Sequence, residues 1–297
     1  MVEQLRMNVA SVIKELEVAL KVLTEAKIMS RYRRIFKGRG LEFEDYREYT
    51  TDDDSSEIDW KASKRANKLV IRRYKEERDM NVFLLVDVSS TMLFGSTEKL
   101  KYEYAAELTA ALAHLILQSG DRVGLVLFAD NIVKFIEPSK GTKHLYMLLK
   151  SLLTAKYYGG EYDISKALSF IMNATSEKSM AFVISDFIGL KEDWKKSVKL
   201  ASGKFDCIGI MLRDPRDEKL PAGFGQVVIS DPFSDKEMLI DSNEKGRIEY
   251  ERYVRVNENN IKTALKAGNW DIVDISTSEN FVTPVIKFLK RREYLLR

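Results

Sequence analysis

The stretch VFLLVDVSSTMLFG, residues 82–95, decides the fold class. It opens with an apolar run typical of a strand buried on both faces, and the run stops at Asp87. Hydroxyl residues follow at alternate positions, Ser89 and Thr91. Further apolar runs alternate downstream with segments of helical periodicity. This alternation predicts an α/β fold, in which a doubly wound, mostly parallel sheet is flanked by helices.

The expected elements of this sheet and its helices are read from length and periodicity. We expect strands at 82–86, 122–128, 180–185, 205–212 and 270–275, and helices at 98–118, 143–153, 164–172, 194–201, 248–266 and 282–292. A β-hairpin insertion is expected near 225–241, between the fourth strand and the next helix. Residues 80–297 therefore form the main domain.

The first 79 residues have a different pattern. Leucine, valine and isoleucine recur at spacings of three and four over residues 5–26, which predicts an amphipathic helix. The run NKLVIRRY, residues 67–74, has the β-branched content of a strand. The block from about residue 35 to 73 has too few apolar residues for a core of its own, so we expect it to pack on the main domain. Trp60 is the expected packing anchor.

The bulk composition excludes several classes of protein. The 297 residues carry 48 lysines and arginines against 45 acids, a net charge of +3, so nucleic-acid binding is not favoured overall. A basic cluster near the N-terminus fits a solvated face better than a phosphate-binding one: Arg31, Arg33, Arg34, Lys37 and Arg39. Cys207 is a single cysteine and no run is long enough to span a membrane. We expect a cytoplasmic protein.

A candidate metal site lies where two expected strands end. Asp87 ends one of them, and Asp186 ends another in the sequence FVISDF. In open α/β sheets, ligands bind at the carboxyl ends of the strands. Together with Ser89 and Thr91 these aspartates form an all-oxygen set, which suits Mg²⁺, Mn²⁺ or Ca²⁺ and not zinc, and we expect Mg²⁺ or Mn²⁺. The alternative is a turn whose side chains only cap the local backbone.

Catalysis is the competing class of function. A strand-end aspartate is also found in phosphoaspartyl phosphohydrolases, which need a second acid two residues later. That position is Ser89, which cannot act as a general acid at neutral pH. The chain also has no glycine-lysine phosphate loop. We therefore expect no enzymatic activity.

The motif DVSST, residues 87–91, resembles the signature of von Willebrand factor A domains and their metal-ion-dependent adhesion site. The upstream segments GRGLEFEDYREY, residues 38–49, and EIDWKAS, residues 57–63, resemble the domain of unknown function 58 family, whose members carry such a domain. The downstream DPRDEKLP and DPFSDKEMLID are similar to its hairpin region. The resemblance implies a metal-dependent adaptor that works with a MoxR-type AAA+ ATPase in assembly or chaperone-like activity.

The chain departs from the family pattern at two places. An arginine usual before the IDW triplet is missing, and the aligned positions include Asp54 and Ser56. The second metal loop reads YYGGEYDISKAL, so Glu161 or Tyr162 stands where the family has a threonine. Glu161 is an uncertain ligand, and we expect it to face solvent because Gly159 and Gly160 leave the loop flexible. A scaffold with a degenerate metal site is therefore a second interpretation.

Overall fold

The fold is centred on a six-stranded sheet with the strand order β10-β7-β6-β3-β4-β5. The computed structural model describes residues 41–50, 53–76, 79–175, 177–223, 225–234 and 236–295. The five strands from β10 to β4 run parallel, and β5 is antiparallel to β4 at one edge. The predicted doubly wound, mostly parallel sheet is therefore confirmed.

The apolar runs form strands because each is buried on both faces. The strands of the sheet are β3 (Asn81–Asp87), β4 (Arg122–Phe128), β5 (Ile132–Ser139), β6 (Ser179–Ser185), β7 (Phe205–Arg213) and β10 (Asp271–Ser276). The central β3 is paired on both sides, with Leu84 opposite Leu125 of β4 and opposite Phe182 of β6. A strand with neighbours on both edges and helices on both faces has almost no contact with water, which explains its unbroken apolar sequence.

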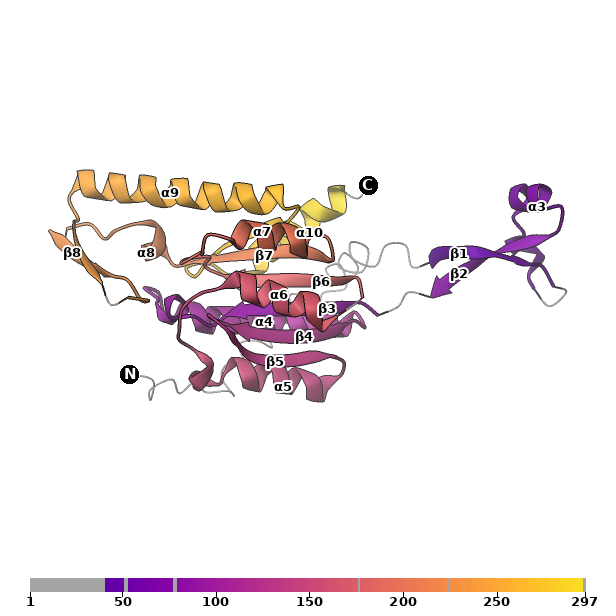
Figure 1. Ribbon diagram of the computed structural model, residues 1–297, viewed down its shortest axis with the longest axis horizontal. Helices are drawn as coiled ribbons and strands as arrows, with labels where there is room; N and C mark the ends of the chain where they lie inside the picture. Colours follow the sequence, from indigo (N-terminus) through magenta and orange to yellow (C-terminus); the bar gives the residue numbers. More distant parts are fainter. Residues whose placement is uncertain are drawn as a thin grey trace.

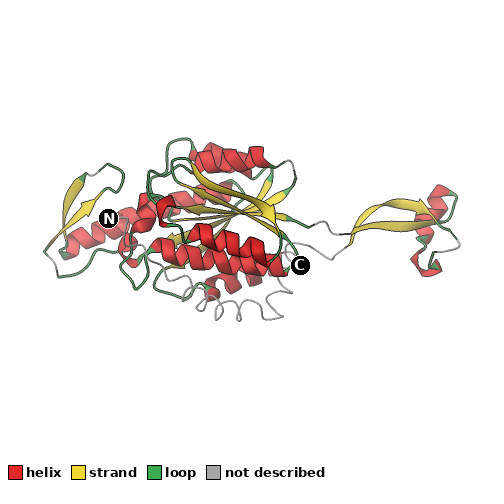
Figure 2. Ribbon diagram, turned by 90° about the horizontal axis from the view of Figure 1, so that it is seen from below, coloured by secondary structure: helices red, strands yellow, loops and turns green. Residues whose placement is uncertain are grey.

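Helices cover both faces of the sheet (Figure 2). One face packs against α4 (Lys101–Gln118), α5 (Thr142–Leu152) and α10 (Val282–Leu295). The other packs against α6 (Ile164–Ala174), α7 (Trp194–Ala201) and α9 (Glu244–Ala267). Short 3-10 helices lie at η2 (Ser55–Glu57), η3 (Ser90–Leu93) and η4 (Ala155–Tyr157). No helix in the described ranges combines the length and the apolar character needed to span a membrane.

The predicted helices and strands of the main domain are present, with ends displaced by a few residues. The edge strand β5 was not predicted, because its partly exposed sequence IVKFIEPS lacks the apolar run of a central strand. The expected hairpin is present as β8 (Gln226–Ser230) and β9 (Glu237–Asp241). A single helical turn, α8 (Pro215–Glu218), precedes it and was also not predicted.

The N-terminal segment forms a small unit of its own. Strand β1 (Leu41–Glu48) pairs antiparallel with β2 (Val70–Glu76), and α3 (Trp60–Ala66) lies between them in the chain. Figure 1 shows this unit standing clear of the six-stranded sheet. The side chain of Trp60 is 69% exposed, so its expected role as an anchor on the main domain is not seen. The amphipathic helix at 5–26 and the basic cluster lie outside the described residues.

Candidate functional site

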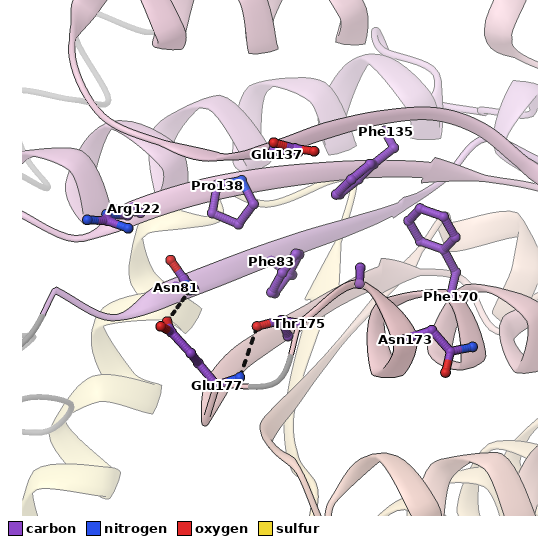
Figure 3. Close-up of a pocket in the computed structure, with 11 residues that line it drawn as sticks. Asn81, Phe83, Arg122, Phe135, Glu137, Pro138, Phe170, Asn173, Thr175 and Glu177 are labelled. Carbon is purple, nitrogen blue, oxygen red and sulfur yellow. Dashed lines mark hydrogen bonds between the residues drawn. The ribbon is translucent and has the colours of Figure 1, made fainter.

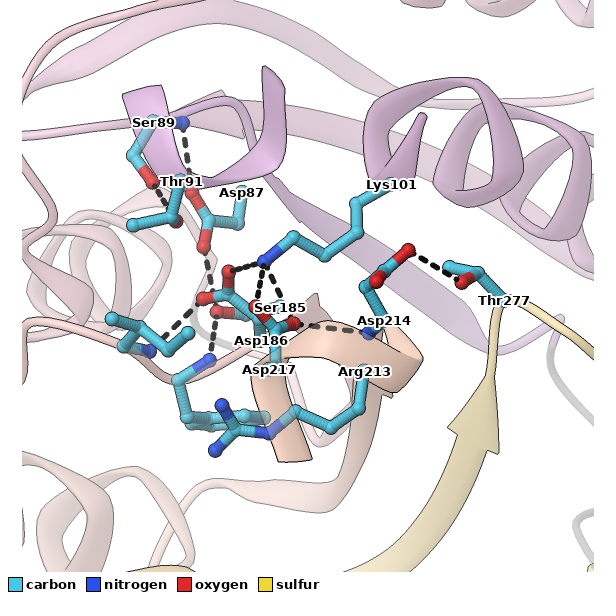
Figure 4. A network of polar contacts seen from close by, with 12 residues as sticks. Asp87, Ser89, Thr91, Lys101, Ser185, Asp186, Arg213, Asp214, Asp217 and Thr277 are labelled. Carbon is cyan, nitrogen blue, oxygen red and sulfur yellow. Dashed lines mark hydrogen bonds and ion pairs between the residues drawn. The ribbon is translucent and has the colours of Figure 1, made fainter. Parts of the chain in front are cut away.

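Two strand ends bring the predicted metal ligands together. Strands β3 and β6 are parallel neighbours, so the residues that follow them emerge at the same edge of the sheet. Asp87 is the last residue of β3, and Asp186 follows the last residue of β6. Figure 4 shows both carboxylates in one polar network, with Ser89 and Thr91 beside Asp87. The sequence pattern therefore located a real cluster of oxygen atoms.

The Asp87 carboxylate is fixed by hydrogen bonds at both of its oxygens. The Ser89 backbone N–H donates to Oδ1 at 2.8 Å, and the Ser185 hydroxyl donates to Oδ2 at 2.7 Å. The hydroxyls of Ser89 and Thr91 lie 3.1 Å apart. The alternation of D-x-S-x-T thus places three oxygen-bearing side chains together, as the sequence predicted. Ser185 is an additional member that the sequence motif did not indicate, although it stands directly before Asp186.

The loop that follows β6 holds the second carboxylate. Asp186 accepts from the Ile188 backbone N–H through Oδ1 at 2.9 Å. Phe187 is buried with a φ of +54°, a conformation that bulky L-residues rarely adopt and that costs free energy. Its backbone N–H donates to the Ser185 hydroxyl at 2.8 Å. Strain of this kind is common at functional sites.

The second loop lies against the first, but its glutamate points away. The backbone N–H of Ser90 donates to the Gly160 carbonyl, and that of Gly159 donates to the Val88 carbonyl, at 2.9 and 2.7 Å. The Glu161 side chain is 59% exposed and pairs with Lys191 at 3.2 Å. The interpretation of Glu161 as a ligand is therefore not supported, while the expectation that it faces solvent agrees with this geometry.

Tyr162 is the second-loop residue that turns inward. Its side chain is 1% exposed, and its hydroxyl has no hydrogen-bond partner among the described residues. Burial, followed by the charge of Asp87, holds the pKa of Tyr162 well above its usual value, so the hydroxyl stays neutral. A buried hydroxyl without a partner is costly. Tyr162 therefore brings an unsatisfied neutral oxygen close to Asp87.

A buried lysine completes the network. Lys101, the first residue of α4, is 1% exposed and its Nζ lies 2.7 Å from Oδ2 of Asp186. The same ammonium group contacts both oxygens of Asp217 in α8, at 2.9 and 3.2 Å. Lys101 was not among the predicted site residues, because it lies in an ordinary helical pattern. Asp217 was not a predicted site residue either, and it lies in the segment DPRDEKLP that resembles the family's hairpin region.

The electrostatics of the cluster are those of buried acids with too few cations. Burial, and then the charge of Asp186, raise the pKa of Asp87 to about 7. Burial also raises the pKa of Asp217. Burial would lower the pKa of Lys101, but the carboxylates of Asp186 and Asp217 raise it, so Lys101 remains charged. The Lys101 ammonium group thus pairs with Asp186 and Asp217, and the Asp87 carboxylate has no cationic partner in these contacts.

Three observations indicate that these residues suit a hard divalent cation. The donor atoms are carboxylate and hydroxyl oxygens, which Mg²⁺ and Mn²⁺ prefer. The cluster has more negative than positive charge when it is ionised. The Tyr162 hydroxyl is a buried polar atom that lacks a partner among the described residues. Asp87, Ser89, Thr91 and Asp186 would hold such an ion.

The site is covered by protein. Asp87, Ser89 and Asp186 have no exposed surface, and Thr91 has only 5%. A separate hollow of about 670 Å³ lies at the opposite, amino edge of the strands (Figure 3). Its walls include Phe83, Phe135 and Phe170, and its Asn81 side chain donates to Glu177 at 2.8 Å. This hollow is unconnected with the acidic cluster.

The sheet topology is that of a von Willebrand factor A-like fold. The family model described as "Protein of unknown function DUF58" matches residues 45–260, and the chain belongs to that family. The uncharacterized protein Rv1480 of Mycobacterium tuberculosis is 22% identical over 287 residues, which cover 96% of this chain and 90% of the relative.

The fold is shared by a protein of known structure. The conserved hypothetical protein BatB from Bacteroides thetaiotaomicron matches with a TM-score of 0.50 and 16% identity, covering 72% of this chain and 99% of BatB. The SpRpn10 VWA domain matches with a TM-score of 0.42 and 12% identity, covering 70% of this chain and 94% of that domain. At 16% identity the likeness to BatB concerns the fold alone.

Proposed function

We propose that the protein is a non-enzymatic, metal-dependent protein-interaction module. The observation that carries the proposal is the convergence of Asp87 and Asp186 with two hydroxyls at the carboxyl edge of the sheet. Asp87 and Asp186 would hold Mg²⁺ or Mn²⁺, and the charge of that ion would favour an acidic side chain of a partner that the carboxylates alone would repel. Binding then requires both the ion and a local movement that uncovers it.

The partner class follows from the family resemblance. A MoxR-type AAA+ ATPase is the partner that the resemblance implies, and the protein then acts as its adaptor in assembly or chaperone-like activity. The absence of a general acid at Ser89 supports an interaction role over phosphohydrolase chemistry. The ATPase supplies the nucleotide hydrolysis.

A second candidate function is a scaffold with a degenerate metal site. It is favoured by the Lys101 ammonium group, which already neutralises Asp186 at 2.7 Å. Such a scaffold would bind its partner whether or not a metal is present. The two functions therefore differ in a single measurable property, the dependence of partner binding on a divalent cation.

A pull-down of a MoxR-type ATPase by the tagged full chain separates the two functions. The adaptor function predicts recovery in about 5 mM Mg²⁺ and loss with a chelator. The variant Asp87→Ala should show no Mg²⁺-dependent recovery, whereas Glu161→Gln, altered at an exposed position, should behave as the wild type. Equal recovery with and without the chelator would favour the scaffold.

A further inference from the structure

Lys101 is placed where neither helix formation nor burial favours a lysine. It is the first residue of α4, where the partial positive charge of the helix N-terminus disfavours a cation. Its side chain is also 1% exposed, and burying an ammonium group is costly unless it is paired. The local structure therefore does not explain this residue. Its contacts with Asp186 and Asp217 do.

The ammonium group has two carboxylate partners on different elements. Asp186 belongs to the loop after β6, and Asp217 belongs to α8 (Figure 4). Lys101 donates to Oδ2 of Asp186 at 2.7 Å and to the two oxygens of Asp217 at 2.9 and 3.2 Å. Losing Asp186 would thus leave Lys101 still bonded to a carboxylate. Asp217 is therefore already in place as the alternative partner of Lys101.

Asp186 has both of its oxygens engaged. Oδ1 accepts from the Ile188 backbone, and Oδ2 accepts from Lys101. A divalent cation beside Asp186 would have the Lys101 ammonium as a close neighbour of like charge, and like charges repel strongly where water is excluded. The bound metal and the Lys101–Asp186 pair therefore oppose each other.

We propose that Lys101 is a built-in cation that competes with the metal ion for Asp186 and moves onto Asp217 when the metal binds. This inference rests on the proposed function, because it describes how the same metal site is regulated. Lys101 lowers metal affinity and keeps the buried acids partly neutralised when no metal is present. Lys101 does not bind the ion, and it affects metal binding only through its ion pair with Asp186.

The proposal also connects the metal site to the neighbouring insertion. The Asp217 carboxylate accepts from the backbone of Asp214, and the hydroxyl of Tyr250 in α9 donates to the Asp217 carbonyl at 3.2 Å. Beyond α8, Phe233 in the β8–β9 turn approaches Gly189 of the Asp186 loop so closely that a Cβ there would lie 2.6 Å from its ring. A shift of Lys101 toward Asp217 would therefore change the contacts of α8, which precedes the β8–β9 hairpin in the chain.

Mn²⁺ titration of Lys101→Met and Asp217→Asn tests the competition. Removing the competing ammonium should tighten Mn²⁺ about tenfold or more, while removing the alternative partner should weaken it several-fold. Lys99→Met is the matched control, because Lys99 pairs with Glu107, at 2.7 Å, and not with a carboxylate of the cluster. The Mn²⁺ affinity of this variant should match that of the wild type. If Lys101→Met fails to fold, the direction in which Asp217→Asn changes the Mn²⁺ affinity still tests the proposal: unchanged or tighter binding would overturn it.

A spectroscopic readout separates a moved lysine from a distant charge effect. In protein with ¹⁵N-labelled lysines, the Lys101 ammonium signal is identified by its loss in Lys101→Arg. Saturating Mg²⁺ should shift this signal and leave that of Lys99 in place. A signal that stays unchanged while the metal binds would overturn the inference.

The outcomes for the inference and for the proposed function are distinct. Metal binding by the wild type, with no tightening in Lys101→Met, overturns the role of Lys101 and leaves the proposed function intact. Binding by Lys101→Met alone supports competition and contradicts a metal-dependent function of the native chain. No binding by either protein overturns both.

Discussion

Replacing Asp87 with asparagine should stabilise the metal-free protein at alkaline pH. Asp87 is fully buried, and burial together with the charge of Asp186 raises its pKa from 3.8 to about 7. The folded state therefore holds the proton more tightly than the unfolded chain. Stability is unaffected by this group below pH 3.8, falls as the pH rises toward 7, and stays reduced above it.

The size of this penalty follows from the pKa difference. The pKa of Asp87 in the folded state lies about 3 pH units above its ordinary value. Since one pH unit corresponds to 1.36 kcal/mol, the ionised Asp87 lowers the free energy of unfolding by about 4 kcal/mol at pH 8. Asparagine is neutral and avoids it, but has one acceptor oxygen for the two donors, Ser89 N–H and Ser185 hydroxyl. Since the loss of such a bond costs about 1–2 kcal/mol, the net gain at pH 8 is about 2–3 kcal/mol.

Urea unfolding in the presence of a chelator at pH 4.5, 6 and 8 measures this effect. Asp87→Asn should be more stable than the wild type at pH 8 and should lose that advantage at pH 4.5. Asp214→Asn is the control of opposite sign. Although burial alone would raise the pKa of Asp214, hydrogen bonds, first from Ser96, lower it below its usual value. Its charge therefore contributes stability above pH 3.8, which this variant lacks at pH 8. An Asp87→Asn protein that is less stable than the wild type at pH 8 would refute the reasoning.

Three further predictions follow from the exposure and contacts of single side chains. Tyr162→Phe removes a buried hydroxyl that has no partner among the described residues, so urea unfolding should show a metal-free protein stabilised by about 1 kcal/mol, and calorimetry should show weaker Mn²⁺ binding. Glu161→Gln should change the Mn²⁺ dissociation constant less than about threefold, because the exposed carboxylate pairs with Lys191; a large loss would make Glu161 a ligand. Trp60→Ala should leave the main thermal transition within about 2 °C of the wild type, since its ring is 69% exposed, whereas a large drop would restore its role as an anchor.

The sequence predicted the sheet because its central strands are buried on both faces. The runs that end at Asp87 and Ser185 are uninterrupted by polar residues, and short apolar runs of this length between helical segments are typical of central parallel strands. The edge strand β5 has water on one side and mixes polar with apolar residues, so periodicity alone could not find it. Strand β1, which is exposed over residues 45–48, escaped prediction for the same reason.

The candidate site was predictable only where local sequence determines geometry. Asp87, Ser89 and Thr91 lie within five residues, and the end of a neighbouring strand supplies Asp186. Lys101 and Asp217 are brought together by tertiary packing across 116 positions of sequence, and no short motif records such a contact. Whether Glu161 or Tyr162 turns inward depends on how the second loop packs against the first, which the glycines alone do not determine.

The most direct test of the central claim is Mn²⁺ binding followed by the electron paramagnetic resonance signal of the free ion. The full chain is titrated beside Asp87→Ala, with Glu161→Gln as the control for a surface acid. Our account predicts that the wild type and the control each take up one ion per chain, that excess Mg²⁺ displaces it, and that Asp87→Ala takes up none at the same concentrations. Equal uptake by the wild type and Asp87→Ala, or no uptake by the wild type, would contradict it.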